Sequence, residues 1–174
     1  MLSKQLTHKT LIRYDENIGH LFVPNITMRQ PNSEKPYYIK TNSQGFRSDF
    51  DYKNVKEGNE IRIAFIGDSY TAGEGVANEK RFSDLVSTAF AAKSYNFGLS
   101  ASGVDQQYLI YKDIASKFDH DVLVISPHII NIYRNLLASR KSVEGQTGKK
   151  ILVPKPYFTL ENQKLVRHNF SSTS

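Results

Sequence analysis

The sequence predicts a flavodoxin-like α/β fold, a doubly wound parallel sheet with helices on both faces. Two observations lead to this prediction. Three short segments rich in apolar and aromatic residues, 61–66, 94–97 and 121–125, have the length and composition of strands. The segments between them repeat apolar residues at helical spacing, and a strand–helix–strand–helix–strand order gives a parallel sheet covered on both faces.

Helices are expected between the three strands. In the segment 79–90, apolar residues recur at i, i+3, i+4, i+7 and i+8 starting from Phe82, and the residues from Val104 to Phe118 follow a similar pattern. The sequence therefore predicts two helices with one apolar face each, a face that normally packs on the core. A further short helix is expected over 128–138.

The composition changes along the chain and divides it into three parts. An N-terminal extension, 1–58, is polar and interrupted by prolines, and its residues 37–50 suit a β-hairpin with the turn near 42–45. The α/β core follows at 59–138. The last part, 139–174, is expected to be a basic, loop-like tail.

The composition also bounds the kind of protein. The chain has 174 residues, of which 39% are hydrophobic and 23% charged, so a packed core is expected. The absence of cysteine excludes a disulfide scaffold, a thiolate nucleophile and a cysteine zinc site. Without a membrane-spanning run or a signal peptide, the expected location is the cytoplasm. The five scattered histidines suggest no metal site, and no cofactor is expected.

Positive charge gathers near the C-terminus. The chain has a net charge of +6, and residues 134–174 hold eight basic and two acidic side chains. These basic residues are spread singly, so a solvated segment is the favoured interpretation. Binding of nucleic acid through this segment is the minority hypothesis.

The ends of the predicted strands form the expected binding crevice, because ligands of open parallel sheets bind beyond the carboxyl ends of the strands. These ends, 67–75, 96–103 and 126–131, are rich in small, hydroxyl and amide residues. Ser69 follows the first strand. Its hydroxyl either projects into the crevice, as in the nucleophile elbow of acyl-transfer enzymes, or caps the next helix.

Four segments resemble the SGNH (GDSL) hydrolase family. Residues 66–73, Ile-Gly-Asp-Ser-Tyr-Thr-Ala-Gly, look like its first block, and 96–106 are similar to its second block. Residues 121–135 occupy the place of the third block. Residues 42–47 resemble a segment that precedes the first block in some polysaccharide-modifying members.

The resemblance implies a role for each matching residue. Ser69 would be the nucleophile that attacks an ester carbonyl, and its backbone N–H would be one oxyanion donor. The second block would supply another backbone N–H, from Ala101 or Gly103, and the Asn131 amide would be the third donor. The remaining supporting positions of the first block are Asp68, Thr71 and Gly73.

The chain departs from the family pattern at three places. Ala101 stands where the second block has glycine, and Ile132 follows Asn131 where the third block has aspartate. The last block, Asp-x-x-His, is missing, since no histidine has an aspartate three residues before it. A serine without a base is a poor nucleophile. His128 is the nearest substitute, although a half-buried helix-start histidine that bonds to the backbone is the favoured interpretation.

The resulting expectation is an ester hydrolase that is incomplete at its C-terminus. The resemblance implies a carbohydrate O-acyl (acetyl) esterase or acyltransferase, acting on a small-molecule or glycan ester and inactive if the chain is a fragment. The alternative is a non-catalytic ligand-binding module that uses the same crevice. Three parallel strands leave an uncovered sheet edge, so association with a partner or with itself is also expected.

Overall fold

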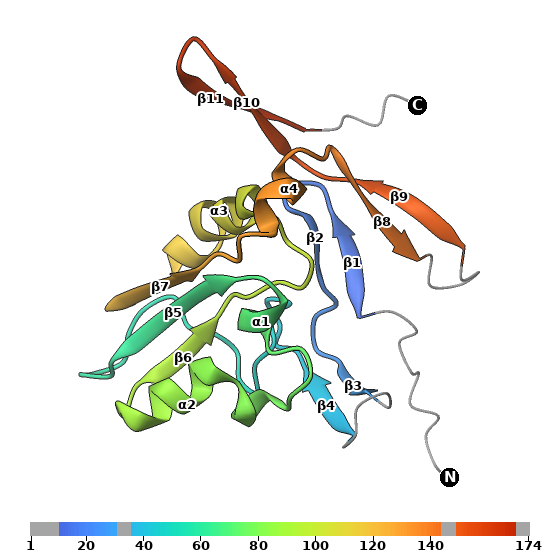
Figure 1. Cartoon of the computed structure of the whole chain (residues 1–174). Coiled ribbons are helices and arrows are strands. Elements are labelled where there is room, and N and C mark those ends of the chain that lie inside the picture. The colour runs from blue at the N-terminus through green and yellow to red at the C-terminus, as the bar shows by residue number, and fades with distance from the viewer. Residues whose placement is uncertain (1–10, 31–35, 144–148, 170–174) are drawn as a thin grey trace.

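The computed structural model describes residues 11–30, 36–143 and 149–169 of the chain (Figure 1). The structure is a mixed α/β fold. Within these residues, one three-stranded parallel sheet is accompanied by four two-stranded antiparallel sheets. No helix in the described ranges is long and apolar enough to cross a membrane.

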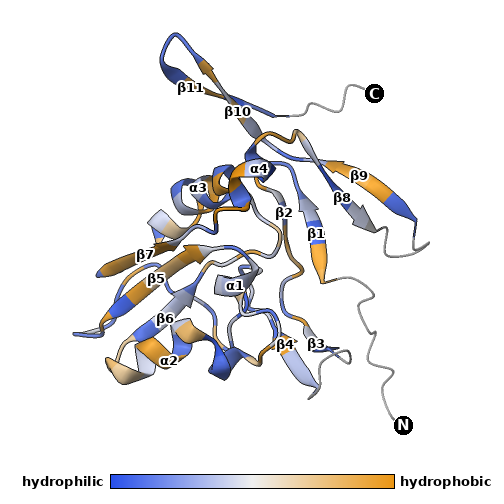
Figure 2. Cartoon of the chain, in the orientation of Figure 1, coloured by the Kyte–Doolittle hydropathy of each residue, from blue (hydrophilic) through white to orange (hydrophobic). Residues whose placement is uncertain are grey.

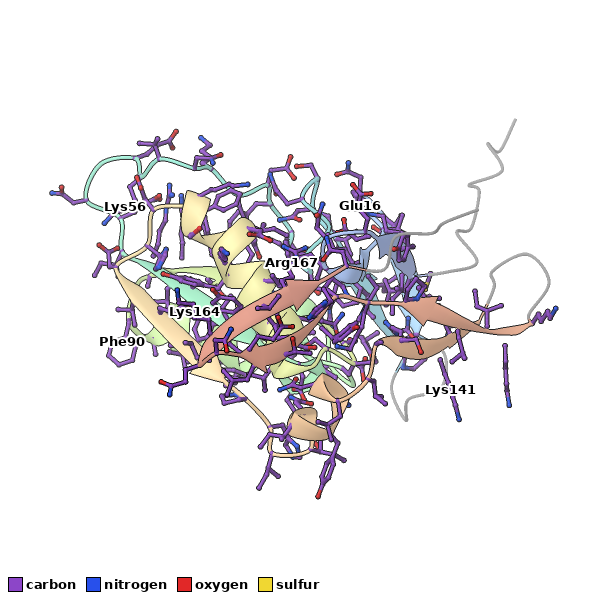
Figure 3. The ribbon with its side chains drawn as sticks, turned by 90° about the horizontal axis from the view of Figure 1, so that it is seen from above. Glu16, Lys56, Phe90, Lys141, Lys164 and Arg167 are labelled. Carbon is purple, nitrogen blue, oxygen red and sulfur yellow. The ribbon has the colours of Figure 1, made fainter. Side chains whose placement is uncertain are left out.

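The central sheet confirms the three predicted strands. It consists of β5 (Arg62–Gly67), β6 (Lys93–Asn96) and β7 (Val122–Ser126) in the order β6-β5-β7, and both outer strands run parallel to β5. Every residue of β5 is buried, as its apolar character predicts for a central strand. The helices α2 and α3 lie on opposite sides of these strands (Figures 1 and 3).

The helical segments are shorter than the sequence predicts. The described residues contain α1 (Ser69–Ala72), the 3₁₀ helix η1 (Asn78–Lys80), α2 (Phe82–Ala89), α3 (Val104–Asp113), the 3₁₀ helix η2 (Ala115–Lys117) and α4 (Asn131–Asn135). The helix predicted over 79–90 is thus divided between η1 and α2. The helix predicted over 128–138 is reduced to the five residues of α4.

Most of the apolar face of α2 points away from the sheet, contrary to the usual orientation, although Phe82 meets a strand residue, Phe65 of β5, edge to face. Leu85 is 55% exposed and Phe90, just after the helix, is 70% exposed, whereas Ser83 and Ser87 are buried. Phe90 projects outward from the ribbon in Figure 3. The physical reason is that the Asn96 amide of β6 donates to Ser83 Oγ over 2.7 Å, so small polar side chains let α2 approach the sheet.

The N-terminal part contains two hairpins, and neither is the one predicted. They pair β1 (Ile12–Asp15) with β2 (Gly19–Phe22), and β3 (Thr27–Gln30) with β4 (Tyr37–Lys40). The hairpin predicted within 37–50 therefore forms only in part, because its first strand, β4, pairs with the preceding strand β3. The predicted turn near 42–45 does form, but a single bridge between Thr41 and Arg47 closes it.

The prediction of a loop-like tail is wrong. Residues 139–174 include two antiparallel hairpins, formed by β8 (Ser139–Val143) with β9 (Lys150–Pro154) and by β10 (Tyr157–Glu161) with β11 (Lys164–His168). The turn between β10 and β11 has positive φ at both Asn162 (48°) and Gln163 (63°). Two-residue hairpin turns require this conformation, which glycine usually supplies. Because neither residue is glycine, the sequence carries only a weak turn signal.

Residues of the predicted N-terminal extension share one hydrophobic core with the sheet. The rings of Phe46 and Phe97 meet edge to face, with 5.0 Å between centroids, and Tyr52 stacks on Tyr95 at 4.4 Å. The Tyr52 hydroxyl donates to the Asn96 carbonyl over 3.0 Å. The loops that follow the central strands are therefore supported from the N-terminal side.

Candidate functional site

Ser69 lies in the turn between β5 and α1. The buried carboxylate of Asp68 caps this short helix by accepting a hydrogen bond from the Tyr70 N–H over 3.0 Å. Ser69 is the first helical residue, so its backbone N–H has no acceptor within the helix. Because the Asp68 carboxylate is the cap, the half-buried Ser69 hydroxyl is not needed to cap the helix and is available to react with a ligand.

Two glycines allow the ends of β5 and β6 to pack against α1. A Cβ at Gly67 would lie 2.0 Å from Thr71 Oγ1, and a Cβ at Gly98 would lie 2.4 Å from the Ala72 nitrogen. Asn96 fixes the contact, because its amide donates to the Thr71 carbonyl over 2.6 Å and its Oδ1 accepts from the Gly98 N–H over 2.9 Å. These motif residues therefore hold the loop after β6 close to the serine.

The C-terminal end of α1 is fixed by Arg47. Gly73 ends the helix with φ of 80°, and its N–H donates to the Ser69 carbonyl over 2.9 Å. The buried Arg47 guanidinium donates to the Ala72 and Gly73 carbonyls over 2.9 and 2.5 Å. Burial and the neighbouring Arg81 lower the pKa of Arg47 to about 10, so it remains charged at neutral pH. The sequence indicates no role for Arg47 beyond its place in the segment 42–47.

Polar groups from the loops after all three central strands meet at Asp68, the residue before Ser69, and at Asn131, as the predicted convergence expects. The fully buried Asn131 donates from Nδ2 to Asp68 Oδ2 over 3.0 Å. Arg134 Nη1 donates to Asn131 Oδ1 over 2.7 Å and to the Ser102 carbonyl over 2.8 Å. The loops after β5, β6 and β7 thus form one hydrogen-bonded cluster. Asn131 keeps a second amide N–H beyond the one that Asp68 accepts.

The geometry distinguishes the two expected backbone donors of the second block. The Gly103 N–H donates to Gln106 Oε1 over 3.1 Å and is therefore already used at the start of α3. The Ala101 N–H has no acceptor among the described residues. Ala101 also has φ of 61°, a left-handed conformation that costs a non-glycine residue about 1–2 kcal/mol. Of the two expected donors, only the Ala101 N–H therefore remains available to an oxyanion among the described residues.

A buried histidine supports the Ala101 loop. His20 of β2 makes a 2.8 Å hydrogen bond from Nε2 to the Ser100 carbonyl, and its Nδ1 lies 3.2 Å from Gln106 Nε2. Gln106 Nε2 also donates to the Ile18 carbonyl, so this nitrogen is a donor and His20 Nδ1 accepts. Burial, together with Arg140, lowers the pKa of His20 to about 3. His20 is thus a neutral positioning residue, and its partner 80 residues away leaves no local sequence signal.

No base is hydrogen-bonded to the Ser69 hydroxyl within the described ranges. His128 is exposed and stacks on Tyr70 with 5.5 Å between ring centroids. Its Nδ1 accepts from the Ile130 N–H over 3.3 Å. The predicted backbone hydrogen bond of His128 is confirmed, but the expectation that it is half-buried is wrong. His20, His120 and His168 hydrogen-bond to other groups.

The described residues contain no group of three or more histidine, aspartate or glutamate side chains placed to hold a metal ion. A scan against models of protein families finds no match to this chain, and a search of curated proteins finds none either.

Proposed function

We propose that the chain is an SGNH-type ester hydrolase or acyltransferase that uses Ser69 as its nucleophile and acts on an O-acylated carbohydrate. The observation that carries the proposal is the cluster of Asp68, Ser102 and Asn131, which joins three strand ends beside a serine that does not cap its helix. The acetyl group and the carbohydrate come from the motif resemblance.

We also propose that the fold is the flavodoxin-like doubly wound sheet, and the order of the central strands supports this. The order β6-β5-β7 equals the first three positions of the flavodoxin-like order 2-1-3-4-5. On β7, Val122 is 45% and Ile125 59% exposed, and within the described residues no strand pairs with the outer edge of β7. We propose that this edge pairs with a strand of another chain, as open edges tend to do.

The proposed chemistry is an acyl transfer. Ser69 Oγ would form a bond to the ester carbonyl carbon, and the carbonyl oxygen would gain a negative charge that the N–H groups of Ser69 and Ala101 stabilise. Collapse of this intermediate would break the ester C–O bond and leave an acyl-serine and an alcohol. The hydroxyl proton needs a base, and the described residues place none on Ser69. We therefore expect the isolated chain to react slowly and to respond to an added base.

The test is covalent labelling by a fluorophosphonate with and without about 100 mM imidazole, which supplies a small base in solution. Intact-mass spectrometry should show one adduct on Ser69, formed at least about tenfold faster with imidazole. Ser69→Ala should abolish the adduct. Ser126→Ala, at the end of the adjacent strand, is the matched control and should label like the unchanged chain. Equal labelling of Ser69→Ala and the unchanged chain would refute the nucleophile.

The missing base also favours a second candidate, a non-catalytic module that binds an ester or an anion in the same crevice. In that case Ser69 would not be labelled even with imidazole. A ligand would still raise the melting temperature of the unchanged chain and of Ser69→Ala equally.

A further inference from the structure

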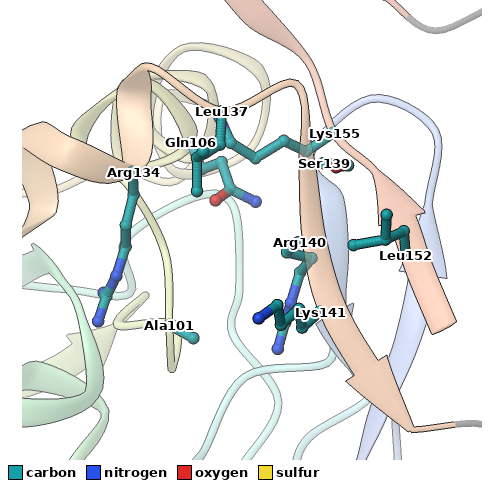
Figure 4. A pocket seen from close by; sticks show the side chains of 9 residues that line it. All are labelled: Ala101, Gln106, Arg134, Leu137, Ser139, Arg140, Lys141, Leu152 and Lys155. Atoms are coloured by element: carbon teal, nitrogen blue, oxygen red, sulfur yellow. The ribbon is translucent and has the colours of Figure 1, made fainter. Parts of the chain in front are cut away.

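A cavity beside Ala101 is lined by positively charged side chains. Its volume is about 400 Å³, and among the described residues its lining includes Arg134, Arg140, Lys141 and Lys155 but no aspartate or glutamate. Figure 4 shows Arg134 on one side and Arg140 with Lys141 on the other, with Ala101 between them. The cavity therefore begins at the residue whose N–H remains available to an ester oxyanion.

Two of these four cations already have partners. Lys155 is buried and forms an ion pair with Asp105, and Arg134 donates to Asn131 and to the Ser102 carbonyl. These contacts fix the cavity wall on the sides of α3 and α4. They neutralise the charge of Lys155. Within the described part of the chain, Arg134 has no carboxylate partner, because both of its acceptors are neutral.

Arg140 is the unusual member of the group. Its Nη1 is buried, yet it has no hydrogen-bond partner among the described residues. Burial and the charge of Arg134 lower the pKa of Arg140, which shows that the folded chain disfavours a cation at this position. Buried donors are rarely left without an acceptor, and such cases call for a functional explanation. Lys141 is the adjacent exposed residue of β8 and adds a further positive charge.

We propose that this cavity binds an anionic group of the molecule whose acyl ester lies at Ser69. A carboxylate, a sulfate or a phosphate supplies acceptors for the guanidinium groups of Arg134 and Arg140 that line the cavity, and a guanidinium group matches the planar pair of oxygens in a carboxylate. This inference rests on the proposed function and narrows it to acidic, O-acylated sugars. It also gives a reason for four of the eight basic residues of 134–174 to line one cavity.

The first experiment measures ligand-dependent melting at constant ionic strength, with glucuronate as the carboxylate probe and glucose as its neutral counterpart. Glucuronate should raise the melting temperature with an apparent Kd of about 1–10 mM, typical of one charge-assisted contact, and glucose should not. Glucose 6-sulfate and glucose 6-phosphate replace the carboxylate with the other two anions, so the three responses identify the preferred one.

Amino-acid substitutions test whether glucuronate binds at this cavity. Arg140→Gln should weaken glucuronate binding about tenfold, since a charge-assisted hydrogen bond is lost. Arg29→Gln removes an exposed arginine of β3 and should leave the Kd unchanged. Lys141→Gln changes an exposed side chain of the cavity, so it keeps the test open if Arg140→Gln does not fold, and it should weaken binding about threefold.

The outcomes separate the two proposals. Ser69→Ala should bind glucuronate as well as the unchanged chain does, so a failed labelling test with intact glucuronate binding would end the proposed function and leave the anion site standing. The anion site is overturned if no anionic sugar stabilises the unchanged chain, or if Arg140→Gln responds like Arg29→Gln. It is equally overturned if a single-stranded oligonucleotide binds more tightly than every sugar and depends on Arg140, because the ligand would then be a nucleic-acid backbone.

Discussion

Arg47 and Arg140 show that the two sides of the site are built differently. Arg47 is buried and donates five hydrogen bonds, to three backbone carbonyls and to the Asn78 side chain. Arg140 has a buried Nη1 that donates none within the described residues. Beside Arg47, Phe46 and Ala72 are fully buried, whereas on the Arg140 side Leu136 is 80% and Leu152 69% exposed.

This difference indicates that the region around Arg47 stabilises the fold, whereas the region around Arg140 is available to a ligand or a partner. A buried cation whose donors are all satisfied fixes the backbone around it, as Arg47 does for α1. A buried donor without an acceptor costs stability, so its retention points to a ligand or a partner. Figure 2 shows hydrophobic residues along β7 and β9, on the open side, where Ile125 is 59% exposed.

The largest effect is expected from Arg47→Met. The substitution keeps an unbranched apolar stem but leaves the Ala72, Gly73 and Val76 carbonyls without their donors. Because each unsatisfied buried group costs about 1–3 kcal/mol, the free energy of unfolding should fall by at least about 3 kcal/mol in urea titrations. Arg29→Met, on an exposed strand position, should change it by no more than about 0.5 kcal/mol. A loss below about 1 kcal/mol for Arg47→Met would remove the contrast with Arg140.

The next effect is a pH dependence that comes from His20. The pKa of His20 is about 3 in the folded chain and about 6.5 when unfolded, so the unfolded state binds the extra proton as the pH falls. Stability from this group is present above about pH 6.5 and is lost as the pH decreases towards 3. By pH 5 the loss should reach about 2 kcal/mol, at 1.36 kcal/mol for each unit below 6.5.

His20→Gln is the variant that isolates this effect. Glutamine retains an N–H donor for the Ser100 carbonyl but does not titrate. Its free energy of unfolding should fall about 2 kcal/mol less than that of the unchanged chain between pH 7.5 and pH 5. His128→Gln removes an exposed histidine and is the control for the loss of a ring. Parallel pH profiles for His20→Gln and the unchanged chain would show that a neutral His20 ring does not link β2 to the Ala101 loop.

The sequence predicted what depends on short-range pattern. The central strands follow from apolar runs, and the motif glycines Gly67 and Gly98 stand where a Cβ would collide with α1. The pattern around Phe82 predicted a helix correctly but could not show which face meets the sheet, since that depends on the Asn96–Ser83 contact. The orphaned nitrogen of Arg140 depends on the folding of β8 beside α4, and no local pattern encodes it.

The smallest expected change in the free energy of unfolding comes from Ala101, which lies between the Arg47 side and the Arg140 side of the site. Ala101→Gly removes a left-handed alanine at a cost of added freedom in the unfolded chain, so the net gain should be about 0.5–1 kcal/mol in the free energy of unfolding. Ala91→Gly is a matched control, because Ala91 has φ of 48° at an exposed position after α2 and should gain as much. Labelling of Ser69 should stay within about twofold in both variants, because glycine retains the backbone N–H. A tenfold slower label in Ala101→Gly alone would mean that the Cβ itself, and not only the amide, shapes the site.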